Sequence, residues 1–402
     1  MRVLCTTLGS PSHGRAQLPL LRALARAGHQ VLVVTTEALA PVFHDDDVEV
    51  TAVLPQFDPV ALLGPHLGEL QDSDDLSLAS PVLMRLMMRS LAGPGVKPHL
   101  DLLAPLAREF RPDLILRDGM DMGAVLTAEL LGVPHLPTPS GFSNIMDPAE
   151  VLPRLNERRR ELGLPERDDP LSLVAHGRVD YVPPAFTFSR YLPPTLSYRQ
   201  TVDVERRQVL PPWAAGLPTD RPWVYAAIGT ALPVMHEHMG GGSTPLPVKV
   251  PEAADSLEAI LGAAAELDDC TVIVSTSGVP VDTGGLPGHV HVTERVPQPL
   301  LLESVDLFVT HGGFNSVREA LRTGTPLAVL PHFGDQYTNA ERVVELGLGG
   351  HITDRSASGI AGMCRTLLAD PVPRARARAA RLAMLTLPDV EQAVGDLEGI
   401  AG

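Results

Sequence analysis

Residues 309–321 of this 402-residue chain read VTHGGFNSVREAL, and their order of apolar, glycine and helical positions predicts the fold class. An apolar run that ends at Thr310 is typical of a buried strand, and apolar residues at helical spacing begin at Phe314. Between them, residues 311–313 form a tight turn whose two glycines let another group approach the backbone. Strand, glycine turn and helix in this order begin a βα unit of a parallel sheet.

The start of the expected helix carries Asn315 and Ser316 in its first turn. A helix N-terminus offers N–H groups without partners inside the helix, so small polar side chains beside it make the turn suited to bind phosphate. An ordinary βα turn with a capping serine has the same local sequence. The flanking residues therefore have to decide between a phosphate site and a structural turn.

The alternation of strands and helices continues through the second half of the chain. Apolar runs bounded by glycine and proline predict strands, and longer segments with apolar residues at helical spacing predict helices. The strands are expected at 222–229, 271–275, 290–293, 307–310 and 327–330, and the helices at 257–267, 300–302, 314–322 and 340–346. This order indicates a parallel sheet covered by helices.

The first half shows the same alternation and begins with strand, helix and strand. The strands are expected at 2–8, 30–36, 48–54, 113–116, 134–137 and 181–189, and the helices around 18–25, at 81–110 with a break near 93–95, at 122–131 and within 145–180. We therefore expect an α/β protein with two doubly wound Rossmann-like domains, residues 1–208 and 222–387, joined by a proline-rich linker at 209–221. Such sheets bind ligands at the carboxyl ends of their strands, which predicts a site in a cleft between two facing domains.

The charge balance excludes several classes of partner. The chain has 32 basic and 48 acidic residues and a formal net charge of −16, which disfavours nucleic acid and anionic lipid. It contains no apolar stretch of the roughly 18–20 residues that cross a bilayer. We expect a soluble, cytoplasmic protein that binds neither nucleic acid nor membrane.

Metal sites and disulfides are not expected either. Cys5, Cys270 and Cys364 are too few and too far apart for a disulfide or zinc framework. The stretch 236–242, HEHMGGG, offers two histidines and a glutamate, but adjacent ligands on a glycine-rich loop rarely converge on one ion. A flexible insertion is the preferred interpretation, and no cofactor is expected.

The residues around the glycine turn form a longer pattern. It consists of Val-Pro-Gln at 296–298, His-Gly-Gly at 311–313, Ser316, Glu-Ala-Leu at 319–321, Gly-Thr-Pro at 324–326, and Pro-His-Phe-Gly-Asp-Gln followed by Asn-Ala at 331–340. The block over residues 294–350 resembles the donor-binding signature of family 1 glycosyltransferases, and the bacterial natural-product branch is the most similar. The resemblance implies the GT-B fold and a nucleotide-sugar donor bound by the second domain. It also implies a final helix in 388–402 that crosses back to the first domain.

The resemblance assigns a part of the donor to each matching residue. It implies a diphosphate cradle at His311, Gly312, Gly313, Asn315 and Ser316, a ribose contact at Glu319, sugar contacts at Asp335 and Gln336, a further phosphate contact at Gly229 and Thr230, and a nucleobase contact at Arg295 and Val296. A carboxylate accepts hydrogen bonds from two neighbouring hydroxyls, which fits Glu319. Relatives often carry an aromatic residue where this chain has Arg295, whose guanidinium plane can also stack on a base.

The resemblance also implies a catalytic base in the first domain. His13 precedes His29 by the same interval as the catalytic histidine of related enzymes, although Ser12 and Ala16 depart from their pattern. Such a base needs a carboxylate that orients it, and Asp118 at the end of a strand is the preferred partner. Asp121, three residues later, is the alternative.

The implied reaction is an inverting, metal-independent transfer of a sugar from a dTDP or UDP donor to an apolar natural-product aglycone. Two alternatives remain at this point: an isomerase resembling nucleotide-sugar 2-epimerases, and a non-catalytic nucleotide-sugar-binding protein. The sequence leaves open the sugar, the acceptor and the oligomeric state, with a homodimer as one option. Met84, Met87 and Met88 recur at helical spacing and fit either an acceptor pocket or plain core.

Overall fold

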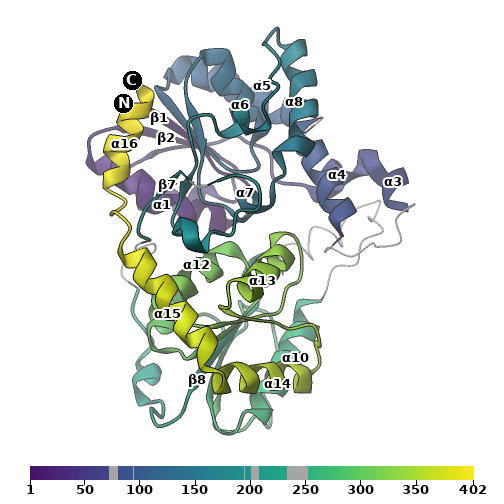
Figure 1. Ribbon diagram of the computed structural model, residues 1–402, viewed down its shortest axis with the longest axis vertical. Coiled ribbons are helices and arrows are strands. Elements are labelled where there is room, and N and C mark those ends of the chain that lie inside the picture. Colours follow the sequence, from purple (N-terminus) through teal and green to yellow (C-terminus); the bar gives the residue numbers. More distant parts are fainter. Residues whose placement is uncertain (72–79, 94, 194, 201–207, 233–251) are drawn as a thin grey trace. The chain divides into compact units, whose positions relative to one another are not determined.

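The two halves of the chain each fold around a parallel sheet, as the computed structural model shows (Figure 1). The structure describes residues 1–71, 80–93, 95–193, 195–200, 208–232 and 252–402. Two compact units result: the first holds Met1–Leu76, Ser80–Val204 and Thr386–Gly402, and the second holds Glu205–Leu385. The stretch 236–242, considered above as a metal loop, lies outside the described residues.

The sheet of the first unit has the strand order β3-β2-β1-β4-β5, with all neighbours parallel. Its strands are β1 (Arg2–Thr6), β2 (Gln30–Thr35), β3 (Glu49–Ala52), β4 (Leu114–Arg117) and β5 (His135–Pro137). The chain winds outward from β1 to β3 and then resumes on the other side of β1 at β4. The loops that leave β1 and β4 therefore lie at the topological switch point, where sheets of this kind bind ligands.

Helices cover both faces of this sheet because successive residues of each strand point to opposite sides. Leu4 packs with residues of the helices on one face, and Val3 and Cys5 pack with those on the other. The helices are α1 (Pro11–Arg26), α2 (Pro59–Leu63), α3 (Leu67–Gln71), α4 (Pro81–Ala92), α5 (Val96–Phe110), α6 (Met122–Leu131), α7 (Gly141–Ile145), α8 (Pro148–Glu161) and α16 (Gln392–Ala401), with short 3₁₀ turns between some of them.

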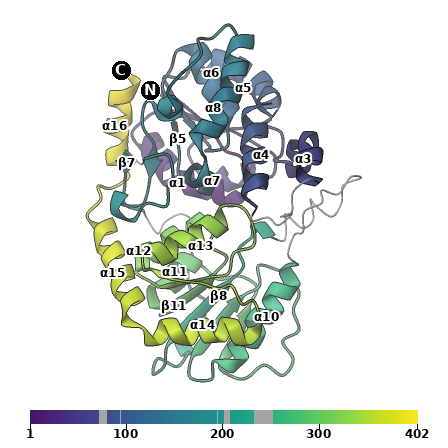
Figure 2. The same ribbon diagram turned by 45° about the vertical axis from the view of Figure 1, so that its right-hand side comes forward.

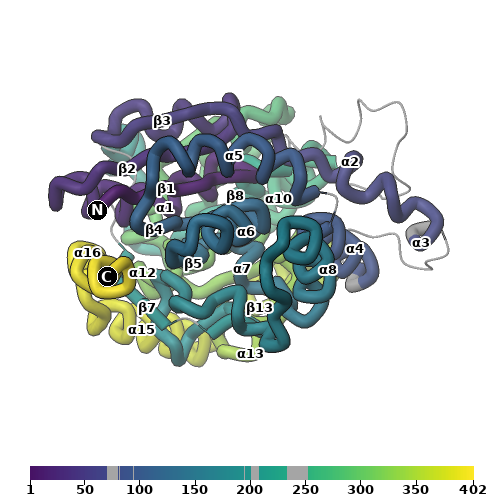
Figure 3. Tube along the Cα trace, turned by 90° about the horizontal axis from the view of Figure 1, so that it is seen from above, coloured from purple at the N-terminus to yellow at the C-terminus, as the bar shows by residue number. Residues whose placement is uncertain are grey.

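The C-terminal helix α16 packs on the first unit, and the two chain ends lie side by side (Figure 3). Leu397 is fully buried in the apolar cluster that contains Val3. The hydroxyl of Tyr198 donates to the carboxylate of Asp396 at 2.7 Å, and Arg26 forms an ion pair with Glu391 at 2.7 Å. The last 17 residues, from Thr386 on, are thus part of the first unit in the structure.

The sheet of the second unit has the order β10-β9-β8-β11-β12-β13 and is parallel throughout. Its strands are β8 (Trp223–Ala227), β9 (Thr271–Ser275), β10 (Val290–Thr293), β11 (Leu307–Thr310), β12 (Leu327–Val329) and β13 (Gly349–His351). Here the order reverses between β8 and β11, so the loops after these two strands lie at the switch point. The residues of the glycine turn, 311–313, form one of these loops.

Helices enclose this sheet as well, and α10 and α14 lie side by side on one of its faces (Figure 2). The set comprises α10 (Ala253–Glu266), α11 (Gln298–Leu301), α12 (Phe314–Thr323), α13 (Asp335–Glu345), α14 (Ala357–Ala369) and α15 (Pro371–Leu385). No helix among the described residues is long and apolar enough to span a membrane.

Some expected elements differ from the observed ones. The strand expected at 181–189 was wrong: only Val179–Asp180 forms a strand, because Pro183 and Pro184 have no N–H for a ladder and a 3₁₀ turn follows at once. The helix expected at 340–346 begins earlier, at Asp335. The segment expected as a plain linker contains a 3₁₀ turn, Pro212–Gly216.

Candidate active site

The switch-point loops of the first unit bring His13 and Asp118 together. His13 lies in the first turn of α1, and its Nδ1 is 2.8 Å from Oδ2 of Asp118, which directly follows β4. The buried Asp118 carboxylate also accepts hydrogen bonds from the main-chain N–H groups of Leu8, at 3.2 Å, and Met120, at 3.0 Å. Since an ionised carboxylate only accepts, Nδ1 carries the proton and Nε2 is the basic nitrogen.

The His13 ring is 18% exposed, while its carboxylate partner is fully buried. Gly9, in the loop after β1, has φ +79°, and a β-carbon there would lie 3.2 Å from the ring. The loop therefore packs closely against the imidazole. A partly exposed imidazole held by a buried carboxylate can accept a proton from a substrate, because the carboxylate stabilises the imidazolium that forms.

Asp121, the alternative partner, has a different role in the structure. Its carboxylate caps α6 by accepting from the N–H of Ala124 at 3.0 Å, and it lies 3.7 Å from Nδ1 of His99. Burial alone would raise the pKa of Asp121, but the hydrogen bond and charge of His99, with the capping N–H, lower it. Of the two carboxylates left open by the sequence, Asp118 is thus the one in contact with His13.

Two buried polar residues near this dyad were not identified from the sequence. Arg117 lies at the end of β4, and its guanidinium donates to the carbonyl oxygens of Asp118, at 3.3 Å, and Leu173, at 2.9 Å. Burial lowers the pKa of Arg117 to about 10, while the charges of Asp121 and Asp118 oppose the shift. An arginine ending an apolar strand, directly before Asp118, was the signal in the sequence.

Gln17 is the second of these residues and lies one helical turn after His13. Its amide oxygen accepts from the hydroxyl of Thr7 at 2.5 Å, and its amide nitrogen donates to the hydroxyl of Thr138 at 2.9 Å. Gln17 therefore ties α1 to the segments that follow β1 and β5. A single glutamine in an amphipathic helix gave no specific signal in the sequence.

The switch-point loops of the second unit enclose the ring of His311. A β-carbon at Gly229 or Gly313 would overlap this ring, and Gly229 also has φ +74°. Burial lowers the pKa of His311 to about 4, and a hydrogen bond to the main chain of Ala227 opposes part of the shift. The imidazole is therefore neutral near pH 7, and glycine on both sides allows the ring to lie against the backbone.

The adjacent helix α12 begins with Gly313 as its N-cap, and no side chain caps it. Gln298, at the start of α11, donates its amide nitrogen to Oγ of Ser316 at 3.2 Å and to a carboxylate oxygen of Glu319 at 2.6 Å. One amide thus orients two residues that the resemblance assigns to the donor. Gln298 was quoted in the sequence motif but not selected as a site residue.

Helix α13 contributes the residues that the resemblance assigns to the sugar. The side-chain amide of Asn339 donates to Asp335 at 2.9 Å and to the carbonyl oxygen of Gly312 at 2.8 Å, so it links the α13 start to the glycine turn. Gln336 is 2% exposed, and its amide oxygen accepts from the main-chain N–H groups of His332 and Phe333. The oxygen of Gln336 therefore holds the loop, and its side-chain nitrogen makes no hydrogen bond to any residue that the structure describes.

Three further residues that the resemblance assigns to the donor, Arg295, Thr230 and Val296, take no part in the hydrogen bonds described above. The Arg295 side chain is 76% exposed and lies 3.8 Å from the carboxylate of its neighbour Glu294. Thr230 is exposed and Val296 is half-buried. In the first unit, Met88 is a core residue and Met84 and Met87 pack against the same cluster, which favours plain core for these methionines.

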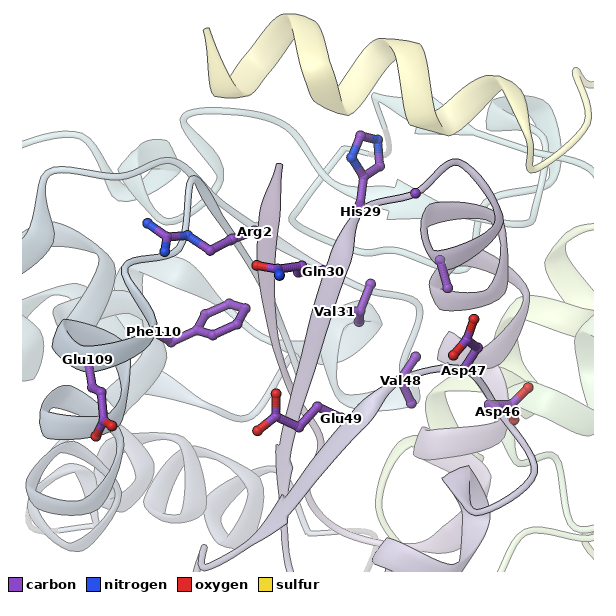
Figure 4. A pocket seen from close by; sticks show the side chains of 12 residues that line it. Arg2, His29, Gln30, Val31, Asp46, Asp47, Val48, Glu49, Glu109 and Phe110 are labelled. Carbon is purple, nitrogen blue, oxygen red and sulfur yellow. The ribbon is translucent and has the colours of Figure 1, made fainter.

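A hollow of about 780 Å³ opens at the other edge of the first sheet, where Arg2 and Gln30 begin their strands (Figure 4). The acidic side chains that line it are those of Asp46, Asp47, Glu49 and Glu109. None of the site residues selected from the sequence lines this hollow. Among the described residues, no group of three or more histidine, cysteine or acidic side chains is arranged to hold a metal ion.

The fold agrees with that of solved glycosyltransferases of the GT-B class. Glycosyltransferase SnogD from Streptomyces nogalater matches with a TM-score of 0.73 and 23% identity, covering 100% of this chain and 99% of that one. The spinosyn rhamnosyltransferase SpnG complexed with thymidine diphosphate matches with a TM-score of 0.74 and 22% identity, covering 99% and 100%. The protein is a GT-B glycosyltransferase.

Sequence comparison gives the family. The models of the erythromycin biosynthesis protein CIII-like family match this chain at residues 22–229 for the N-terminal domain and 258–400 for the C-terminal domain. The chain is also 30% identical over 395 residues to the L-demethylnoviosyl transferase of Streptomyces niveus, covering 94% of this chain and 92% of that relative. The chain belongs to this family, within the natural-product glycosyltransferases of family 1.

Proposed function

We propose that this enzyme transfers a sugar, with inversion, from a thymidine- or uridine-diphosphate donor to an apolar natural-product aglycone, with His13 as general base. The observation that carries the proposal is the 2.8 Å hydrogen bond between Nδ1 of His13 and the buried Asp118. The names of its relatives, among them a demethylnoviosyl transferase, and a solved relative holding thymidine diphosphate support the donor and the acceptor class.

The first part of the proposed reaction is the removal of a proton. Nε2 of His13 takes the proton of an acceptor hydroxyl while the hydroxyl oxygen bonds to the anomeric carbon of the sugar. Asp118 stabilises the imidazolium that forms, because its negative charge is fixed by main-chain N–H groups. General base catalysis of this kind contributes about 10²–10⁴-fold to the rate.

The second part is the departure of the nucleoside diphosphate, as the bond between the anomeric carbon and the phosphate oxygen breaks. The N-terminus of α12 stabilises negative charge through its dipole and its N–H groups, and Ser316 in its first turn adds a hydroxyl. His311 is neutral, and its hydrogen bond to the main chain of Ala227 uses its single N–H, so it adds no positive charge and packs against the glycine turn. In this proposal protein donors stabilise the diphosphate, and no metal ion is required.

The test is an assay with purified enzyme, a thymidine-diphosphate sugar and a panel of apolar aglycones. Release of free nucleoside diphosphate that depends on an aglycone, with a glycosylated product of opposite anomeric configuration by NMR, is the expected result. Epimerisation of the donor without an acceptor would instead indicate the isomerase. Binding of the donor without turnover of any kind across the panel would favour the non-catalytic alternative.

A further inference from the structure

Three neighbouring strands of the second sheet end at the same edge and carry polar residues just beyond their ends. His311 follows β11, His332 lies three residues after β12, and Arg355 lies four residues after β13. These strands are adjacent and parallel, so their carboxyl ends share the edge that carries the glycine turn. Of these three residues, only His311 was assigned to the donor site above.

His332 is held in one tautomer. Its side chain is buried, and Nδ1 lies 2.8 Å from a terminal nitrogen of Arg355. A guanidinium only donates hydrogen bonds, so Nδ1 must accept, and the ring proton is on Nε2. The other terminal nitrogen of Arg355 donates to the carbonyl oxygen of Pro331 at 2.7 Å, which fixes the guanidinium beside the ring.

The opposite side of this ring has an N–H that the fold does not use. Nε2 of His332 is buried and makes no hydrogen bond to any residue that the structure describes. Folded proteins pair nearly all buried polar groups, so an unpaired N–H beside a candidate ligand site is available to a bound molecule. The ring is 1% exposed, so a surface position with free access to solvent does not explain it.

The surroundings of His332 belong to the donor half-site. Its main-chain N–H donates to the side-chain oxygen of Gln336 at 2.8 Å, so the residue is bonded to one that the resemblance assigns to the sugar. Burial, the nearby His311 and the charge of Arg355 lower the pKa of His332 to about 3. The ring is therefore neutral and offers one N–H.

We infer that His332 donates its Nε2–H to an oxygen at the junction of sugar and diphosphate in the bound donor, with Arg355 as the positioning residue that fixes the tautomer. The inference rests on the proposed function and adds two residues, and the end of one further strand, β13, to the donor site. The ligand oxygen belongs either to the sugar or to the second phosphate, and both accept hydrogen bonds from a neutral N–H.

The test compares two substitutions of His332 with a control. His332→Phe keeps the ring shape and removes the N–H, whereas His332→Gln can place an amide N–H near the position of Nε2. His289→Phe is the control, because His289 lies before β10 at the opposite edge of the same sheet and bonds through its ring to the carbonyl oxygen of Ala264. Calorimetry measures the dissociation constants of thymidine diphosphate and of thymidine-diphosphate glucose for the full-length chain.

We expect His332→Phe to weaken thymidine-diphosphate glucose binding by about three- to tenfold, the range for one hydrogen bond. His332→Gln recovers most of the loss, and His289→Phe leaves binding unchanged. If His332→Phe weakens the binding of both ligands, the oxygen that accepts the hydrogen bond belongs to the phosphate. If it weakens only the binding of thymidine-diphosphate glucose, that oxygen belongs to the sugar. Unchanged binding of both ligands by His332→Phe, in a variant that unfolds at the wild-type temperature, would overturn the inference.

Arg355 has its own readout, because a merely structural role would not change a tautomer. In wild type, nitrogen NMR of the His332 ring is expected to show the proton on Nε2 alone. Arg355→Met makes both tautomers accessible, and Arg355→Lys retains a donor and the wild-type pattern. Wild type with the proton on Nδ1 would contradict the inference even if the enzyme is active. Failure of wild type to bind either ligand would overturn the proposed function and this inference together.

Discussion

The switch points of the two units each hold a histidine, His13 in the first turn of α1 and His311 directly after β11, and the two histidines have different surroundings. His13 contacts the buried carboxylate of Asp118, whereas His311 lies between Gly229 and Gly313 with a main-chain bond to Ala227. The same topology thus presents one histidine suited to gain a proton and another that stays neutral. The burial of each ring together with the charge of its partner, and not the shared topology, decides the chemistry.

Removing the carboxylate that distinguishes the first histidine should give the largest effect. Asp118→Asn or His13→Ala is expected to lower kcat by about 10²–10⁴-fold, because the base or its orientation is lost. Binding of thymidine diphosphate should stay within about threefold, since its proposed ligands are on the other unit. Steady-state kinetics and calorimetry measure both. Turnover near the wild-type rate in His13→Ala would end its assignment as base.

Asp121→Asn is the matched control, three residues from Asp118. It keeps a side chain that can cap α6 and removes only the negative charge at the start of the helix, so we expect a loss of about 0.3–1 kcal/mol in the free energy of unfolding. The rate of transfer at saturating substrate should remain near wild type. A rate loss as large as that of Asp118→Asn would mean that the two carboxylates act together, and the contrast drawn here would fail.

A second comparison concerns Glu319 and Gln298, which are joined by a hydrogen bond in the second unit. Glu319→Ala is expected to weaken nucleoside diphosphate binding by about 1.5–3 kcal/mol, the range for hydrogen bonds to a charged group. Gln298→Leu, which removes the amide that orients Glu319, should give a smaller loss. Calorimetry at constant salt distinguishes the two. Equal affinity in wild type and Glu319→Ala would exclude the ribose contact.

The neutral state of His311 predicts a pH dependence of stability. Folding lowers its pKa from 6.5 to about 4, so between these values the unfolded chain binds more protons than the folded one. The free energy of unfolding therefore falls as the pH falls through this window, by about 3 kcal/mol in all and by about 2 kcal/mol down to pH 5. Urea unfolding at pH 7.5 and pH 5 measures this change, and the free energy of unfolding of His311→Gln should fall less between the two pH values than that of wild type. Substitution of the exposed His44 by Gln is the control and should follow wild type.

The glycines beside the ring give a smaller effect. Gly229→Ala and Gly285→Ala both place a β-carbon at a positive φ, +74° and +77°, which by itself should cost each about 1–2 kcal/mol of stability, and Gly229→Ala should lose more because its β-carbon overlaps the His311 ring. Of these two glycines, Gly229 lies against His311, and nothing lies within 4 Å of the β-carbon position at Gly285. We therefore expect only Gly229→Ala to weaken thymidine diphosphate binding, measured by calorimetry. If the two variants bind thymidine diphosphate equally well, His311 does not contribute to donor binding.

The smallest expected effect is that of chelation. If protein N–H groups alone stabilise the leaving diphosphate, dialysis against EDTA should leave the rate of transfer unchanged. The assay is repeated with added Mg²⁺ as a control. A rate that falls on chelation and returns with Mg²⁺ would replace the metal-independent step of the proposal.

The sequence was most informative where the signal is local. The strands at 271–275, 290–293 and 307–310 and the helix at 122–131 were predicted with the bounds that the structure has, because apolar periodicity and bounding glycines or prolines are properties of consecutive residues. The prediction of a strand at 181–189 was wrong because it followed the apolar residues of this segment and gave too little weight to Pro183 and Pro184. The donor motif was readable for the same local reason.

Only the tertiary structure decided which side chains meet. Asp118 and Asp121 are three residues apart and equally acidic, yet the turn after β4 directs one to His13, 105 residues away, and the other to its own helix. Gln298 meets Glu319, and Arg355 meets His332, for the same reason. By itself, the sequence determined the alternation of strands and helices, the glycine turn and the family. The strand order determined these contacts, because parallel sheets bring the ends of distant segments to one edge.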